Sequence, residues 1–85
     1  QPVDLKHLLG QALRSLERRI ASSGGVVDVD WQSLPTVRGD PVLLKQLLEN
    51  LIWNAIKFSQ PNPVVRVSAS RDLLDWVISV EDNGP

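Results

Sequence analysis

The sequence predicts an α+β fold, a two-layer sandwich in which helices lie on one face of a mostly antiparallel sheet. Two helical patterns alternate with pairs of short apolar segments, in the order helix, strand, strand, helix, strand, strand. The last two segments are close in the chain, which favours an antiparallel hairpin. Elements in this order bury their apolar surfaces when the helices pack against one side of the sheet.

The first helix is predicted to begin after Asp4, a favoured N-cap residue, and to end at Gly24-Gly25. Its apolar side chains recur at the i, i+3, i+4, i+7 spacing of one helix face. They are Leu5, Leu8, Leu9, Ala12, Leu13, Leu16 and Ile20, and the outer side carries Arg14, Glu17, Arg18 and Arg19. We expect a packing element, with His7 at its surface or boundary.

Residues 26–31 predict a half-exposed strand, because apolar and acidic side chains alternate there. A second short extended segment is expected at 36–38. The next helix should begin at Pro41, since Asp40 is a favoured N-cap and the first helical position needs no amide hydrogen. We expect this helix to run over 41–58 and to end before the proline-containing loop that follows.

The last part of the chain predicts two extended segments, 64–70 and 74–82, with a turn around Arg71-Asp72. In the second segment, side chains at alternate positions fall on opposite faces of the sheet. Trp76, Ile78 and Val80 therefore share one face. We expect the two segments to pair as the hairpin.

The composition excludes several classes of function. Nine Lys plus Arg against ten Asp plus Glu give a net charge of 9 − 10 = −1, and the 85 residues contain no cysteine. This balance argues against a broad nucleic-acid face and a polybasic membrane anchor, and no thiol is available for a disulfide or a metal. The sequence has neither an apolar run near the ~20 residues of a membrane span nor a signal-like start. We expect a cytoplasmic location.

The second helix carries a polar stripe beside its apolar arc. Asn50, Asn54 and Lys57 fall within about 60° of one another around the helix. The apolar arc consists of Leu44, Leu47, Leu48, Leu51, Ile52 and Ala55. Asparagine is unfavourable inside a helix because its side chain competes for backbone hydrogen bonds. The stripe indicates either a solvated or locally hydrogen-bonded surface, or a polar ligand site.

The chain end is a second notable feature, because Asp82 follows an apolar strand and Gly84 comes two residues later. A carboxylate there is an acceptor at a sheet edge, beside backbone that a ligand can approach closely. The same residue types also form ordinary turns. Both interpretations remain open from this segment alone.

Together the two segments resemble a known family. The segment 50–59 reads Asn-Leu-Ile-Trp-Asn-Ala-Ile-Lys-Phe-Ser, and it is preceded by Gly39-Asp40 and Gln46. It resembles the N-box of the ATP-binding catalytic domain of bacterial sensor histidine kinases. Residues 80–85 resemble the start of that family's Asp-x-Gly-x-Gly motif. The resemblance covers essentially the whole chain, and it implies the Bergerat fold of the gyrase, heat-shock chaperone, histidine kinase and mismatch-repair ATPases.

The resemblance implies a role for each matching residue. Asn54 corresponds to the asparagine that binds the magnesium ion bridging the nucleotide phosphates, and Lys57 to the lysine that steadies those phosphates. Asp82 corresponds to the aspartate that accepts a hydrogen bond from the adenine amino group, and Gly84 to the glycine beside the base. Asn50 corresponds to a glutamate that activates water in related ATPases. An amide there removes the general base, which suits phosphoryl transfer to histidine.

Two neighbouring residues need separate interpretations. Phe58 either packs near the nucleotide or belongs to the core. Glu49 is adjacent to Asn50 and could be mistaken for the general base, but the helix turns it about 100° away from the stripe. We expect Glu49 to be solvent-exposed.

The resemblance also implies a whole-protein function. The parent protein is expected to bind ATP with magnesium and to transfer the γ-phosphoryl group to a histidine, from which an aspartate of a response regulator receives it. The acceptor histidine lies on a dimerisation helix of the parent, and His7 lacks the sequence context of that acceptor. The parent is expected to be membrane-anchored, if at all, through other segments.

Residues 1–85 are expected to be an N-terminal, truncated portion of this domain. The family's second motif glycine, lid and further glycine-rich motif would follow Pro85. We therefore expect weak or absent ATP binding, and no kinase activity, for these residues alone.

Other interpretations stay open. The chain could be a non-enzymatic interaction or dimerisation module on a degenerate ATPase fold, forming a homodimer or domain swap through exposed sheet. The parent could instead be a gyrase-like or anti-sigma ATPase, or the chain an unrelated α+β module. The Lys57-Phe58-Ser59 ending and the amide of Asn50 favour the histidine kinase. No interaction with nucleic acid is expected.

Overall fold

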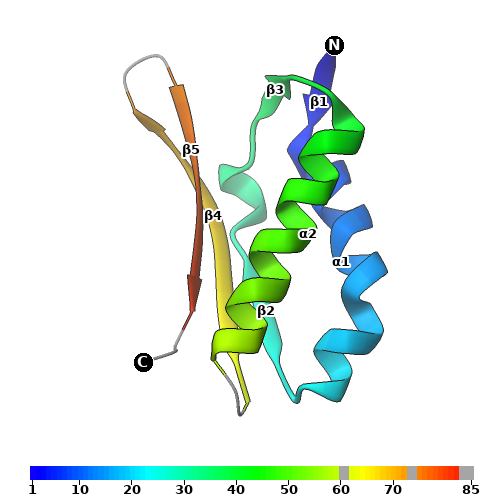
Figure 1. Cartoon of the computed structure of the whole chain (residues 1–85). Helices are drawn as coiled ribbons and strands as arrows, with labels where there is room; N and C mark the ends of the chain where they lie inside the picture. The colour runs from blue at the N-terminus through cyan, green and yellow to red at the C-terminus, as the bar shows by residue number, and fades with distance from the viewer. Residues whose placement is uncertain (60–61, 73–74, 83–85) are drawn as a thin grey trace.

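The computed structural model describes residues 1–59, 62–72 and 75–82. Both long helices lie on the same side of the main sheet (Figure 1). The elements in chain order are β1 (Pro2–Asp4), α1 (Leu5–Ser22), β2 (Val26–Val29), the 3-10 helix η1 (Trp31–Ser33), β3 (Thr36–Arg38), α2 (Pro41–Phe58), β4 (Val64–Asp72) and β5 (Asp75–Asp82). The predicted α+β class and two-layer arrangement are confirmed.

Both helices begin at the predicted aspartate caps. Asp4 accepts a hydrogen bond from the amide of Lys6 at 3.0 Å, and Asp40 accepts from the amides of Val42 and Leu43 at 2.9 and 3.4 Å. These carboxylates satisfy amides that have no partner inside the helix. The predicted bounds of α2 are confirmed at both ends.

The end of α1 follows from its glycine pair. Gly24 adopts φ +71°, a left-handed conformation that glycine tolerates best. The amide of Gly25 then donates to the carbonyl of Ile20 at 3.2 Å, and the Ser23 hydroxyl donates to the same carbonyl at 2.7 Å. The chain therefore leaves α1 with the carbonyl of Ile20 satisfied and enters β2.

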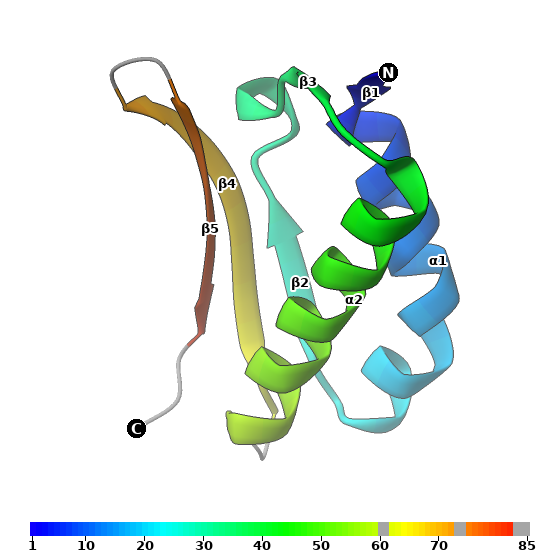
Figure 2. The same cartoon turned by 45° about the horizontal axis from the view of Figure 1, so that its top comes forward.

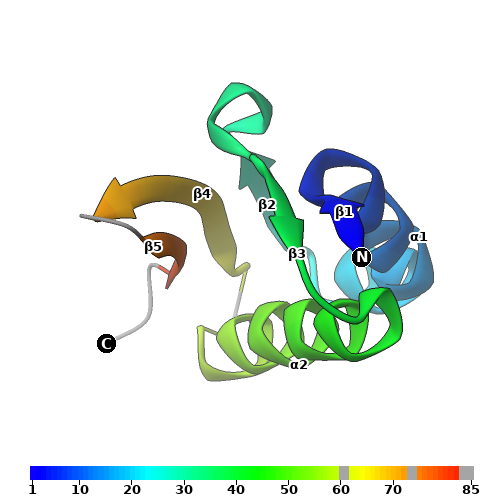
Figure 3. The ribbon, with the colours of Figure 1, turned by 90° about the horizontal axis from the view of Figure 1, so that it is seen from above.

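The strands form two sheets with mostly antiparallel pairing. β4 lies at the centre of a three-stranded sheet, parallel to β2 and antiparallel to β5, while β1 and β3 form a separate antiparallel pair. Figure 2 shows the long, curved β4–β5 hairpin beside α2, and Figure 3 shows both helices on one side of the three-stranded sheet. The predicted hairpin is confirmed.

The predicted turn around Arg71-Asp72 is wrong. Both residues belong to β4, where Arg71 lies opposite Trp76 and Asp72 opposite Asp75. The guanidinium carbon of Arg71 is 5.5 Å from the centre of the Trp76 ring. This contact favours continued pairing past Ser70. The expected strand start at Leu74 lies outside the described residues.

Two further differences concern short elements. Trp31 was expected in the strand, but it begins η1, in which its carbonyl accepts from the amide of Leu34 at 3.3 Å. β1 was not predicted, because three residues carry too little pattern. Its formation depends on pairing with β3, in which Val3 lies opposite Val37.

The core lies between the helices and the sheet. Its most deeply buried large side chains include Leu9 of α1, Ile52 and Ile56 of α2, and Val65 and Val67 of β4. The apolar arc of α2 is broader than its buried strip, because Leu47 is 53% exposed and Leu51 39%. These two side chains border an apolar groove between α2 and β5. Its remaining lining residues are Leu5, Val37, Leu44, Leu48, Trp76 and Ile78.

Candidate functional site

The polar stripe of α2 lies on the outer surface of the helix. Asn50, Asn54 and Lys57 are all exposed, while Ile52 and Ile56 on the opposite side are fully buried. None of the three polar side chains makes a hydrogen bond or ion pair with the residues that the structure describes. The locally hydrogen-bonded interpretation is therefore wrong, while a solvated surface and a polar ligand site both fit the exposed side chains. The stripe presents two free carboxamides and one ammonium group to solvent.

Phe58 extends the stripe with an apolar surface. It is the last residue of α2 and is 73% exposed, so the interpretation as a core residue is wrong. It is four positions after Asn54, which places the two side chains about 40° apart around the helix and one turn apart along it. An exposed aromatic ring thus borders the polar stripe near the C-terminal end of α2.

The end of β5 lies toward the same end of the molecule as this ring. Asp82 pairs with Val65, the second residue of β4, and β4 begins shortly after α2 ends. Figure 1 shows the tip of β5 on the side toward which α2 runs. The antiparallel hairpin therefore returns the backbone of Asp82 toward the last turns of α2. Gly84 lies outside the described residues.

Glu49 is partly buried, contrary to the expected solvent exposure. Its side chain is 28% exposed, and its Oε1 lies 3.8 Å from Nζ of Lys45, one turn earlier on the helix. The ion pair holds the carboxylate along the side of α2, about 100° around the helix from Asn50. Glu49 is therefore not part of the stripe.

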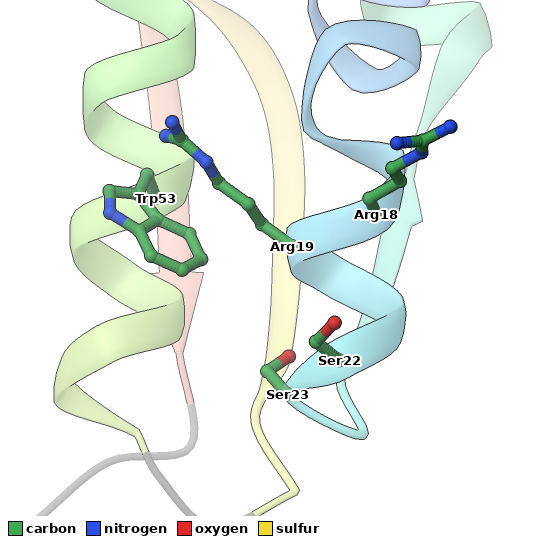
Figure 4. A pocket seen from close by; sticks show the side chains of 5 residues that line it. All are labelled: Arg18, Arg19, Ser22, Ser23 and Trp53. Atoms are coloured by element: carbon green, nitrogen blue, oxygen red, sulfur yellow. The ribbon is translucent and has the colours of Figure 1, made fainter.

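Two features of α2 were not predicted. Trp53 borders a shallow, open cleft of about 370 Å³, which is also lined by Arg18, Arg19 and Ser22 of α1 and by its C-cap residue Ser23 (Figure 4). The hydroxyl of Ser59 is buried without a hydrogen-bond partner among the described residues. In the sequence, only the position of Trp53 beside the polar stripe could have indicated this cleft. The cleft itself forms because α1 packs next to α2, which the sequence pattern does not show.

The described residues contain no cluster of three or more His, Cys, Asp or Glu side chains that could hold a metal ion. In the same part of the chain, neither helix has the length and apolar character needed to cross a membrane.

The sequence matches known proteins along its whole length. Cyanobacterial phytochrome A from Nostoc sp. is 41% identical over 85 residues, which cover 99% of this chain and 11% of that protein. The adaptive-response sensory kinase SasA from Prochlorococcus marinus is 36% identical over 87 aligned residues, covering all of this chain and 23% of that protein. The chain thus spans only a small part of the length of these relatives.

The fold also matches a solved structure. The catalytic domain of the histidine kinase ThkA aligns with the whole chain at a TM-score of 0.82 and 23% identity, and the chain covers 58% of it. The same kinase has been solved in complex with the response regulator TrrA, where the TM-score is 0.80, the identity 24% and the coverage 26%. At this identity the likeness supports the fold.

The family match itself runs over residues 39–85, more than half of the chain, and includes the polar stripe of α2 and all of β4 and β5. With the fold of a sensor histidine kinase catalytic domain, this chain belongs to the histidine kinase-, DNA gyrase B- and HSP90-like ATPase family.

Proposed function

We propose that this chain supplies the magnesium-binding and adenine-binding residues of the catalytic domain of a sensor histidine kinase. The whole protein would transfer the γ-phosphoryl group of ATP to a histidine of its dimerisation helix, and an aspartate of a response regulator would then receive it. The observation that supports this most directly is the exposed, unpaired stripe of Asn50, Asn54 and Lys57.

The stripe has the chemistry that a magnesium-bound triphosphate requires. Magnesium prefers oxygen ligands, and the free carboxamide oxygen of Asn54 is one. Lys57, nearly one turn further along α2, supplies a positive charge for the phosphates. The residues present therefore fit Mg-ATP, which would supply the phosphoryl group when bound.

Asn50 would direct the reaction away from hydrolysis. It lies one turn before Asn54 on the same side of α2. A carboxylate at this position could accept a proton from water, whereas a carboxamide cannot act as a general base at neutral pH. Water near Asn50 would then stay unactivated, and the phosphoryl group would remain available for the acceptor histidine.

The adenine base would lie at the end of β5. Asp82 would accept a hydrogen bond from the adenine amino group, Gly84 would leave room beside the base, and Phe58 would cover part of its apolar surface. A carboxylate selects adenine over guanine because guanine presents an oxygen acceptor where adenine presents an amino donor. The hairpin register supports this placement, since it returns Asp82 toward the end of α2.

The response regulator is proposed as a partner because ThkA, which shares this fold, has been solved with one. We also propose a cytoplasmic location, where ATP is available.

Nuclear magnetic resonance of the ¹⁵N-labelled 85-residue chain with Mg-ATP tests the site. The stripe faces water, where charge interactions are weak, so we expect dissociation constants of about 1 mM or higher. Chemical shifts should change at Asn50, Asn54, Lys57 and the end of β5, and less with Mg-GTP. Asn54→Ala should remove the changes, while Gln11→Ala on α1 should retain them. Equal shifts with both nucleotides, or shifts confined to α1, would contradict the proposal.

The exposed apolar side chains of α2 favour a second candidate function, self-association. Leu43 and Leu47 are 62% and 53% exposed, and the groove beside Leu47 is apolar. In the described sheet, β5 pairs only with β4, so its other edge is open to a further strand. Sedimentation equilibrium should then reveal a dimer that Leu43→Ser with Leu47→Ser weakens. A monomer at high concentration would exclude this function.

A further inference from the structure

The cleft between the C-terminal half of α1 and Trp53 of α2 has a basic and aromatic lining. Arg19 extends from α1 toward the indole of Trp53 (Figure 4), with its guanidinium carbon 5.3 Å from the ring centre. This stacking holds a cation against an aromatic face while leaving guanidinium N–H groups available to a ligand. Arg18 lines the same cleft.

The positive charge around this cleft is not neutralised within the described part of the chain. Arg14, Arg18 and Arg19 are exposed, and none of them forms an ion pair there. Glu17, the one acidic residue of α1, lies about 100° around the helix from Arg18 and about 60° from Arg14, and it forms no ion pair with either. On α2, the acidic residue nearest to Trp53 in the sequence is Glu49. Its Oε1 already lies 3.8 Å from Nζ of Lys45. Arg14 and Arg18 lie about 40° apart around α1 and Arg19 lies about 100° further on, so the three cations spread over about 140° of the helix in a chain of net charge −1.

The geometry favours an extended partner over a single small anion. Figure 4 shows Arg19 directed toward Trp53 and Arg18 directed away from it, so the two guanidinium groups point apart. Arg14 lies one turn before Arg18 and continues the basic surface along α1. One phosphate or carboxylate cannot contact all three groups, whereas a peptide with several carboxylates can.

We propose that the cleft between α1 and Trp53 is a docking surface for an acidic peptide segment of a partner protein. Carboxylates of the peptide pair with Arg14, Arg18 and Arg19, and an apolar side chain between them packs on the Trp53 ring. Arginine and tryptophan are the residue types that contribute most at protein interfaces, since both combine a large contact surface with hydrogen-bond donors. The hydroxyl of Ser22, which has no hydrogen bond to the described residues, supplies a further donor.

Fluorescence anisotropy of the 85-residue chain tests this surface without nucleotide, so the result is independent of the proposed ATP site. The probe is a short labelled peptide that alternates acidic pairs with leucine, and its control replaces the acids by their amides. Arg18→Gln with Arg19→Gln should weaken binding of the acidic peptide about 10-fold, and Arg18→Gln alone about 3-fold. Circular dichroism verifies that each variant is folded.

The matched control removes two positive charges from positions outside the cleft. Lys6→Gln with Arg38→Gln eliminates two exposed cations that do not line the cleft, and it should weaken binding less than 3-fold. An equal loss in both double variants would overturn the proposal in favour of non-specific charge attraction. Equal binding of the amide peptide would also overturn it. So would displacement of the peptide by inorganic phosphate or ATP beyond that by chloride of the same ionic strength, since the cleft would then be a small-anion site.

Discussion

The helices α1 and α2 have the same length and the same type of cap, but they use their apolar residues differently. In α1, Leu5, Leu8, Leu9, Ala12 and Leu16 are all buried. In α2, a buried strip of Leu48, Ile52, Ala55 and Ile56 accompanies exposed Leu43, Leu47 and Phe58. Most of the apolar face of α1 is therefore used in packing against the core. α2 carries exposed apolar and amide side chains that do not pack in the described fold, and these side chains support the ligand site that we propose there.

The largest expected change in stability distinguishes the buried apolar face of α1 from the exposed apolar side chains of α2. Leu9→Ala removes a side chain that is 1% exposed, so it should lower the free energy of unfolding by about 2.5–5 kcal/mol. Leu47→Ala removes a side chain that is mostly in water and should cost less than about 1 kcal/mol. Urea denaturation measures both. Similar losses in the two variants would show that Leu47 is a core residue and that the comparison fails.

A smaller effect should distinguish the two caps. Asp40 accepts from two backbone amides and Asp4 from one. Each aspartate-to-alanine variant should lose about 1 kcal/mol of stability, and Asp40→Ala should lose more. Thermal unfolding measures the difference, with Asp40→Asn as the control, because asparagine retains an acceptor oxygen. If Asp4→Ala costs more than Asp40→Ala, the number of capping bonds does not determine stability here.

The smallest effect on stability should come from the stripe and should have the opposite sign. Asn54→Ala replaces an exposed, unpaired amide by a better helix former, so the chain should gain up to about 0.6 kcal/mol. In the sensor histidine kinase that we propose as the whole protein, the same substitution should abolish most ATP-dependent phosphorylation of the acceptor histidine. A residue whose removal stabilises the fold but impairs activity is retained for function. A loss of stability above 1 kcal/mol would contradict this interpretation.

The elements that sequence patterns predicted well are those with strong local signals. Asp4 and Asp40 marked both helix starts, Gly24-Gly25 marked the end of α1, and alternation marked the hairpin strands. The hairpin turn was misplaced because aspartate is common in turns, whereas the strand pairing continues through Arg71 and Asp72 as the arginine packs over Trp76. β1 was missed because its three residues become a strand only by pairing with β3.

The candidate site was likewise predicted from the sequence only where local patterns place its residues. Helical periodicity alone placed Asn50, Asn54 and Lys57 together, because residues three and four apart share one side of a helix. The approach of Asp82 toward α2 needed the register of β5 against β4. The exposure of Phe58 needed the packed structure, since an aromatic residue at a helix end is equally compatible with a core.

The sequence by itself determined the helices, their caps, the polar stripe and the family, because each depends on residues close together in the chain. The tertiary structure decided how much of α2 is buried, how far the hairpin strands pair, and that Arg19 meets Trp53 across the α1–α2 cleft. Those contacts join segments more than thirty residues apart or depend on cross-strand register. Their geometry follows from how the whole core packs, which no local pattern encodes.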